Sequence, residues 1–291
     1  MDFSPCFIEL AQAPSTEPRV CVPSASQLNL SKNIIGGHYE HEHDGDAKIV
    51  ADSEGVQAIA GALRLNGALT SVHLRGNELG DEGWGAIFAA ICGNKDSKIM
   101  SMDASCEDIS PAGVQLIAEA LRTSVTGALT SLLLAGNELD DDGAEALSIG
   151  LKENKSLTTL DLRGKGNGGG RIGPLGATAL ASAIAVNGSL TSINLSENNL
   201  TNYGRDMTGI KELAAALGVN GALTECNLQS NCLGAKGWTA IFTALRGSKV
   251  SKISMWDLHA EDGIKASIKP LAEYIAVSGG LTKMRYVSPQ T

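Results

Sequence analysis

Aromatic residues are scarce in this sequence: Phe, Trp and Tyr together make up 4% of its 291 residues. Hydrophobic residues nevertheless reach 43%, so enough apolar surface is available for burial and a disordered chain is excluded. The core must therefore be built mainly from Leu, Ile, Val and Ala. Uniform packing of such medium-sized side chains suits a repeating architecture.

Positive charge is also low. The chain has 23 Lys and Arg residues against 32 Asp and Glu residues, which gives a formal net charge of −9. An acidic surface disfavours nucleic acid, whose phosphates bind basic surfaces, and it disfavours an anionic membrane surface. The sequence therefore predicts no nucleic-acid partner and no membrane partner.

Long apolar runs, a leader sequence and closely paired cysteines are missing too. No apolar run reaches the roughly 18 residues that a membrane-spanning helix needs. The start, Met1 to Cys6, has neither the basic residues nor the apolar stretch of a signal peptide. None of the six cysteines forms a C-x-x-C pair, which weakens a zinc or thioredoxin-type interpretation. We expect reduced thiols in a cytoplasmic protein.

What the sequence does contain is a recurring leucine-rich pattern. Residues 69–79 fit L-x-x-L-x-L-x-x-N-x-L, with Val72 in place of one Leu. The pattern returns at residues 129–139, 190–200 and 223–233. Weaker copies start at Ala25, Ile99 and Leu157, and degenerate copies start at Val250 and Leu281. The chain is thus expected to consist of about eight to nine copies of one unit.

Each copy except the last is followed by a second element. A glycine there has aliphatic residues four and eight positions later, as in Gly83, Ile87 and Ile91. A spacing of four marks one face of an α-helix, whereas the x-L-x-L alternation before it marks a strand with one buried face. Each copy therefore predicts a strand, a turn and a helix. The Asn at the ninth position is expected to satisfy backbone groups where the chain turns out of the strand.

The copies must stack, because one strand and one helix cannot bury their apolar faces alone. Strands joined through helices run parallel with right-handed crossovers. A helix is wider (~10 Å) than the spacing between strands (~4.8 Å), so the stack curves with the sheet inside. The predicted fold is an α/β, right-handed leucine-rich repeat solenoid, or horseshoe, over residues 25–291, with a parallel concave sheet and convex helices. Residues 1–24 are expected to form a poorly ordered tail or an irregular cap.

A larger period is visible as well. Gly83-Trp84 reappears as Gly237-Trp238, and Ser97-Lys98-Ile99 reappears as Ser251-Lys252-Ile253, each at an offset of 154 residues. We infer that five repeats were duplicated as a block. The repeat that starts at Ala25 then matches the one at Leu190, with about eleven extra loop residues.

The repeats resemble a known family. Leu129 to Leu132, followed by Asn137 and Leu139 and then by residues 143–147 (GAEAL), is similar to the ribonuclease-inhibitor-like subfamily of leucine-rich repeats. That subfamily includes the repeat domains of NOD-like receptors and the Ran GTPase-activating protein. The resemblance covers roughly Ala25 to the end of the chain. It implies a protein that binds other proteins on the concave face or its rim, and it leaves the partner open.

A histidine-rich segment spans residues 38–46 and contains three imidazoles and four carboxylates. Such a set can ligate zinc, nickel or copper. An extended loop does not pre-position ligands, however, so a plain solvated loop is expected and no cofactor or metal is assigned. The candidate metal ligands in this loop are His38, His41, His43 and Asp44.

A glycine-rich segment, residues 163–170, contains a literal G-x-G-x-x-G at Gly164, Gly166 and Gly169. Its context does not fit a dinucleotide site, because the segment belongs to one repeat among nine and no acidic residue stands about 20 positions further on. It is not a P-loop either, since Lys165 is followed by Gly166 rather than by Ser or Thr. We expect an inserted flexible loop on the rim.

The concave face is the most promising surface, because side chains alternate along a strand and the third, fifth and seventh positions of each repeat should face outward. Their variety is not explained by core packing. Trp256 stands out as an aromatic at a predicted exposed position, and aromatic and Arg residues dominate interface hot spots. A shift of this degenerate repeat by one residue would instead bury Trp256. The candidate binding residues are His73, Arg75, Asp103, Asp161, Arg163, Lys252, Trp256, Lys283 and Arg285.

No nucleophile, base and orienting group line up on adjacent strands, and an open sheet offers no catalytic pocket. The sequence therefore predicts a non-enzymatic scaffold whose partner is another protein. Two rivals stay open: a GTPase-activating protein of the Ran-activator type, for which Arg75 and Arg163 are available, and a sensor or receptor-type repeat module. Against the second, the chain begins with Met1 and shows no nucleotide-binding domain. The last strand, Lys283 to Val287, predicts weak self-association through a free edge.

Overall fold

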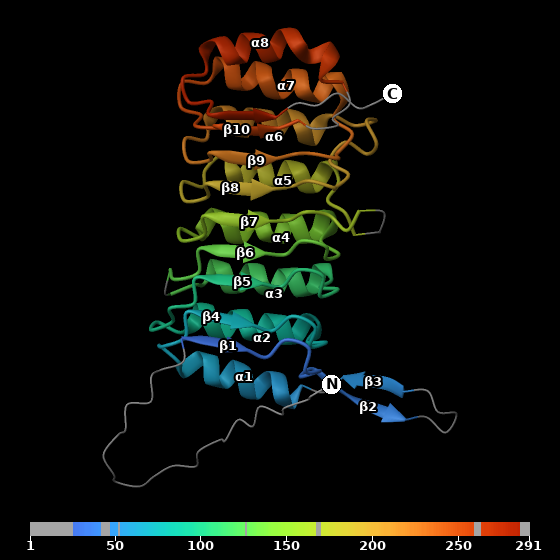
Figure 1. Ribbon diagram of the computed structural model, residues 1–291, viewed down its shortest axis with the longest axis vertical. Coiled ribbons are helices and arrows are strands. Elements are labelled where there is room, and N and C mark those ends of the chain that lie inside the picture. The colour runs from blue at the N-terminus through green and yellow to red at the C-terminus, as the bar shows by residue number, and fades with distance from the viewer. Residues whose placement is uncertain are drawn as a thin grey trace, which may run out of the picture.

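The computed structural model describes residues 26–41, 47–51, 53–125, 127–166, 170–258 and 263–285. Figure 1 shows two layers, one of short strands and one of helices, stacked from the N-terminal to the C-terminal repeat. No helix within these residues is long and apolar enough to cross a membrane.

Nine strands form one sheet in the order β1-β4-β5-β6-β7-β8-β9-β10-β11, and all neighbours are parallel. The strands are β1 (Gln27–Asn29), β4 (Ser71–His73), β5 (Ser101–Asp103), β6 (Ser131–Leu133), β7 (Thr159–Asp161), β8 (Ser192–Asn194), β9 (Glu225–Asn227), β10 (Met255–Asp257) and β11 (Lys283–Arg285). Between consecutive strands lies one helix: α1 (Glu54–Leu65), α2 (Gly80–Gly93), α3 (Pro111–Arg122), α4 (Asp140–Glu153), α5 (Pro174–Ile184), α6 (Thr208–Val219), α7 (Gly234–Gly247) and α8 (Ile268–Val277), which a short 3-10 helix (Lys265–Ser267) precedes. The predicted α/β solenoid is confirmed.

The first repeat carries an insertion. Strands β2 (Gly37–His41) and β3 (Ala47–Ala51) pair antiparallel between β1 and α1, with His38 opposite Val50. This hairpin projects from the N-terminal end of the stack (Figure 1). Residues 38–41 of the histidine-rich segment are therefore in a strand and not in the plain loop that was expected, and residues 42–46 lie outside the described residues.

The core lies between the two layers. In the central repeats, the inward strand residues Leu132 and Leu134 and the helix residues Leu147 and Leu151 are at most 1% exposed. These side chains come from every second strand position and every fourth helix position, as the two periods require. The same arrangement continues through the stack, so each repeat covers the apolar face of the one before it.

One degenerate repeat has a different register from the predicted one. Met255 of β10 lies opposite Glu225 of β9, so the repeat begins at Ile253 and not at Val250. Val250 is 50% exposed, whereas Ile253 and Trp256 are each 3% exposed. A three-residue shift is odd, so it exchanges the two faces of the strand.

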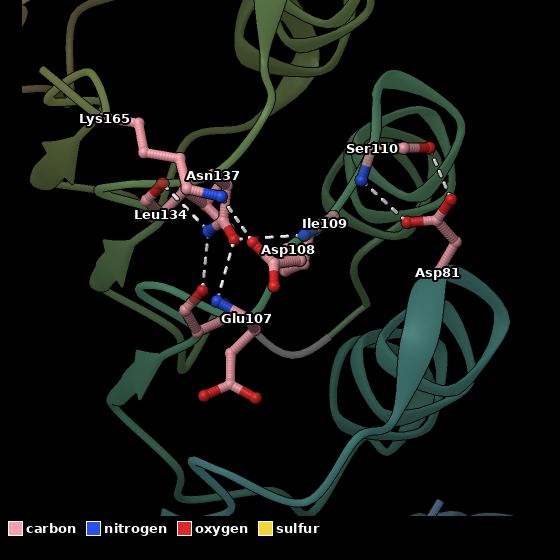
Figure 2. Close-up of polar contacts among 9 residues, drawn as sticks. Asp81, Glu107, Asp108, Ile109, Ser110, Leu134, Asn137 and Lys165 are labelled. Atoms are coloured by element: carbon pink, nitrogen blue, oxygen red, sulfur yellow. Dashed lines mark hydrogen bonds and ion pairs between the residues drawn. The ribbon is translucent and has the colours of Figure 1, made fainter. Parts of the chain in front are cut away.

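Two rows of asparagines fix the turns at the two ends of the strands. The first row is the predicted one at the ninth position. The Asn137 amide nitrogen donates to the carbonyls of Ala104 (2.7 Å) and Leu134 (3.0 Å), and its Oδ1 accepts from Glu107 N (3.0 Å) and Ile109 N (3.1 Å). Figure 2 shows part of this network. It bridges two repeats and satisfies buried backbone groups in both.

The second row was not predicted. It lies where each helix ends and the next strand begins. The Asn187 amide nitrogen donates to the carbonyls of Leu151 (2.7 Å) and Asn154 (3.2 Å) in the preceding repeat. Its Oδ1 accepts from the backbone N–H groups of Ser189 and Leu190. The residues that act in this way are Asn94, Asn154, Asn187 and Asn220.

Candidate functional site

The concave face is formed by the outward side chains of the parallel strands. The register places Asp103 of β5, Leu133 of β6 and Asp161 of β7 side by side across the sheet. Beside this row lie the small residues Ser101, Ser131 and Thr159, also on one line. Two carboxylates therefore flank one half-buried leucine at the centre of the face.

Most fifth-position residues on this face have a structural task. The Asp103 carboxylate accepts a hydrogen bond from Ser105 N at 3.0 Å, and the Asp161 carboxylate accepts one from Arg163 N at 3.0 Å. The same bond to the residue two positions on is made by Asn29, Asn194 and Asn227. A short side-chain acceptor at this position holds the backbone as it leaves the strand. Asp103 and Asp161 are thus partly committed to the fold.

The fifth position departs from this rule at β4 and β6, among other strands. The His73 ring is exposed, and its Nε2 lies 3.0 Å from Ser71 Oγ. Leu133 cannot make the bond and contributes an apolar surface instead. At the seventh position, Arg75 and Arg163 are exposed, whereas Ala135 between them in the stack is 3% exposed. At the centre of the face, Leu133 thus lies between Asp103 and Asp161, and Ala135 lies between Ser105 and Arg163 in the seventh-position row.

Charged residues line the adjoining rim, where the chain leaves the strands. Lys165 Nζ lies 2.5 Å from Asp108 Oδ1, although the two residues belong to repeats that are separated by a third (Figure 2). Hydrogen bonding to Asp108 and its charge raise the pKa of Lys165. Both side chains are exposed, so solvent screens the pair and it adds little stability. It gives the rim a fixed pattern of charge.

Glu107 stands next to this pair. Its Oε1 accepts a hydrogen bond from Gly76 N at 2.9 Å, which ties the rim to the preceding repeat. Partial burial raises the pKa of Glu107, and the Gly76 hydrogen bond and the Arg75 charge act in the opposite direction. Glu107 and Lys165 occupy the ninth position of their repeats. Other repeats have an asparagine of the first row there, such as Asn137, which we call the ladder asparagine. The departure from Asn at the ninth position is the sequence signal for these two rim residues, which were not among the predicted binding residues.

The two buried thiols among the described residues are not activated nucleophiles. Burial raises the pKa of Cys92 to about 11 and that of Cys226 to about 12, so both remain protonated at neutral pH. Cys106 and Cys232 are free and exposed on the rim. No group of three or more His, Cys, Asp or Glu side chains within the described ranges is arranged to hold a metal ion.

The predicted binding residues are distributed unequally. His73 and Arg75 are exposed in the repeat of β4, the second strand of the sheet, Arg163 is exposed just after the central strand β7, and Lys283 is exposed on β11 at the end of the sheet. Lys252 is exposed but precedes the strand, because the repeat begins later than predicted. Arg285 lies in β11 opposite Asp257.

The expectation that Trp256 lies on the concave face is wrong. Its ring is 3% exposed and packs edge-on against Trp238 at 6.0 Å and Phe242 at 6.1 Å between centroids. The three-residue shift of register places it at an inward position, where an aromatic ring gains more from burial than from exposure.

The two loop candidates lie partly outside the described residues. His38 and His41 are in β2, and His43 and Asp44 are outside. In the glycine-rich segment, a side chain on Gly164 would meet the Glu197 carbonyl oxygen at 2.1 Å, and one on Gly170 would meet Glu138 Cα at 2.6 Å. These two glycines are thus explained by close packing between repeats. Gly169 lies outside the described residues.

Comparison with known proteins agrees with this architecture. A family model described as "Leucine Rich repeat" matches residues 68–88 and 129–148. Human "NACHT, LRR and PYD domains-containing protein 13" is 32% identical over 158 residues, which is 45% of this chain and 13% of that protein. The crystal structure of the leucine-rich repeat-containing protein LegL7 from Legionella pneumophila superimposes with a TM-score of 0.51 at 20% identity, covering 90% of this chain and 74% of that one.

The chain is a leucine-rich repeat protein, a class of repeat modules used for protein interaction. It spans only 13% of the length of the human relative. The likeness to LegL7 shows the shared fold. The ribonuclease-inhibitor-like subtype stays a prediction.

Proposed function

We propose that this chain is a non-catalytic scaffold of the ribonuclease-inhibitor-like type that binds another protein through the centre of its concave face and the adjoining rim. The observation that supports this function is a set of exposed charges on a face where most other polar side chains hydrogen-bond to the backbone of their own repeat. Arg75 and Arg163 are exposed and are not needed by the repeat pattern. They lie on either side of the β6 repeat, whose Leu133 and Ala135 are apolar and whose Leu133 is flanked by Asp103 and Asp161.

Such a surface suits a protein partner more than a small molecule. Repeats create an extended, rigid face on which a partner can meet many side chains at once. Apolar side chains with arginines in nearby repeats are typical of an interface, and a mixed-charge rim such as Asp108 and Lys165 selects the partner by complementarity. We propose a cytoplasmic protein as the partner, and neither a nucleic acid nor a membrane.

Affinity capture with charge-reversed variants tests the proposal. We expect the intact chain to retain a specific protein from native lysate, identified by mass spectrometry. The double variant Arg75→Glu/Arg163→Glu should bind that protein at least about tenfold more weakly, because arginines at an interface core carry much of the binding energy. Arg64→Glu, an exposed arginine in the last turn of α1, serves as the matched control. Equal capture by the double variant and the control would reject the concave face as the site.

A further inference from the structure

A surface cavity of about 510 Å³ lies between the N-terminal ends of α6 and α7, away from the concave face. Three of its lining residues are cationic: Arg205, Lys211 and Lys236. Ile210 and Ala240 are among its apolar lining residues. Among the described residues, no Asp or Glu lines it. A cavity with only positive charge is unusual in a chain with a net charge of −9.

The three cations are exposed, and none of them forms a salt bridge within the described part of the chain, whereas Arg122 and Arg246 do. The neighbouring Asp206 accepts a hydrogen bond from Thr208 N at 2.8 Å, which is the largest cause of its lowered pKa, and the charge of Lys211 lowers that pKa further. With Asp206 counted, the cavity still carries an excess of positive charge.

The block duplication supplies an internal comparison, since the same cavity exists in the first block. It has a volume of about 320 Å³, and its lining includes Val56, Gln57, Asp81, Glu82 and Gly83. Each of these residues has a counterpart 154 positions later in the larger cavity. The counterparts are Ile210, Lys211, Ala235, Lys236 and Gly237, in the same order.

The framework is thus preserved while the charge is reversed. Val56 and Ile210 are both apolar, but Gln57 becomes Lys211 and Glu82 becomes Lys236. Asp81 of the first block accepts a hydrogen bond from Ser110 N at 2.8 Å (Figure 2). Its counterpart Ala235 has no such side chain, and a different hydrogen bond links the two repeats there: Ser267 Oγ donates to the Ala235 carbonyl at 2.9 Å. The two lysines replace no such bond. Packing of the repeat does not explain them, because the first block packs without them.

Arg205, Lys211 and Lys236 line one cavity, so an anion that enters it meets three positive charges. The first turn of α7 contains no acidic residue, while that of α2 contains Asp81 and Glu82, so the backbone amides of α7 add to the positive potential. We propose that this cavity binds a phosphate monoester. A dianion with three acceptor oxygens matches two lysines and an arginine, and the apolar walls leave room for the group that carries it. This site is independent of the concave face.

The phosphate could be free or carried on a protein, and one titration series separates the two sources. The full chain, labelled with ¹⁵N, is titrated with sodium phosphate and, at equal ionic strength, with sodium chloride. We expect saturable shifts of the Lys211, Lys236 and Gly237 amides with phosphate only. A degenerate phosphoserine peptide pool is then compared with its unphosphorylated form by fluorescence polarisation. Tighter binding of the phosphorylated pool than of inorganic phosphate identifies a protein-borne group, and binding of inorganic phosphate alone identifies a free one.

Variants that restore the residues of the first block complete the test. Lys211→Gln/Lys236→Glu should weaken phosphate binding at least tenfold, and Lys236→Gln should do so to a smaller extent. Lys249→Glu, at an exposed lysine in the turn after α7, changes the charge by two units outside the cavity, against three units in the double variant, and should bind phosphate as the unaltered chain does. Absence of saturable shifts in the unaltered chain, or their persistence in the double variant, would overturn the proposal, whatever the concave face binds.

Discussion

At the scale of single residues, the buried asparagines explain why the turns of this protein can be short. A backbone group that leaves the strand loses its ladder partner, and burying it without a replacement costs free energy. Asn137 is 1% exposed and serves four such groups in two successive repeats. Neither Asp nor Ala offers two donors and two acceptor lone pairs in the same space.

Replacing this asparagine tests that role. Asn137→Ala should lower the free energy of unfolding by about 2–4 kcal/mol, because several buried backbone groups lose their partner at once. Asn137→Asp should also destabilise the chain, since a carboxylate presents no donor to the Ala104 and Leu134 carbonyls. Asn33→Ala, at the exposed position of the first repeat, is the matched control and should cost less than about 1 kcal/mol. Urea melts decide the question, and equal losses in Asn33→Ala and Asn137→Ala would contradict it.

At the scale of elements, β10 shows how a tertiary environment decides which face of a strand is buried. Its repeat has neither a clear leucine pattern nor the ladder asparagine. Large rings settle the register instead: Trp256 packs with Trp238 and Phe242, and Phe242 stacks on Tyr274 of α8 at 6.0 Å between centroids. This aromatic cluster fills the core between the last helices.

Trp256→Ala should therefore destabilise the protein by about 3–5 kcal/mol through loss of burial and a cavity. Trp256→Phe should cost less, because the indole Nε1 is buried without a hydrogen-bond partner in the described residues and nothing polar is lost with it. Met255→Ala, one residue earlier and on the opposite face, is the control and should cost less than Trp256→Ala. Denaturant melts with near-ultraviolet circular dichroism measure all three. A large loss for Met255→Ala with a small loss for Trp256→Ala would restore the register that the sequence predicted.

At the scale of the whole molecule, the repeats share a framework but differ in charge. The two blocks have equivalent helices and cavities, yet the α2 end carries Asp81 and Glu82 and the α7 end carries Lys236. The equivalent helices of both blocks pack in the same way. The surface charges in which they differ are therefore not required for packing and are available for binding. The stack therefore offers different binding surfaces at its two ends and along its sheet.

The C-terminal end of the sheet carries its own prediction. Among the described residues, β11 pairs only with β10, so its outer backbone groups form an edge. Lys283 is exposed on this strand and Met284 is half-buried. Charged side chains oppose pairing between edges, so we expect self-association that is weak and appears only at high concentration. Multi-angle light scattering should show a concentration-dependent rise in mass that Met284→Lys reduces and Met100→Lys, on an exposed apolar residue of another repeat, does not. A strict monomer at every concentration would exclude pairing at this edge.

The sequence by itself determined the repeat, its strand–turn–helix order and the ladder asparagines, because these follow from local periodicity and from side chains that act within one repeat or on the next. It also indicated Arg75 and Arg163, since a regular strand fixes which residues face outward. The tertiary structure decided which residues lie next to Glu107 and Lys165 and which residues line the cationic cavity, because these neighbours come from other repeats. Lys165, for example, contacts Asp108, which is 57 positions away in the sequence.

The leucine pattern alone does not fix the register of β10, although the 154-residue offset that pairs Ile99 with Ile253 already favours a repeat start at Ile253. Val250, Ile253 and Met255 satisfy the same alternation as Ile253, Trp256 and Leu258, so local hydrophobicity leaves two alignments of similar quality. The choice was made by volume: Trp256 fits a space that Trp238, Phe242 and Tyr274 leave between neighbouring repeats. Burial of so large a ring outweighs the match of smaller residues to a pattern, and that contribution exists only once the repeats are stacked.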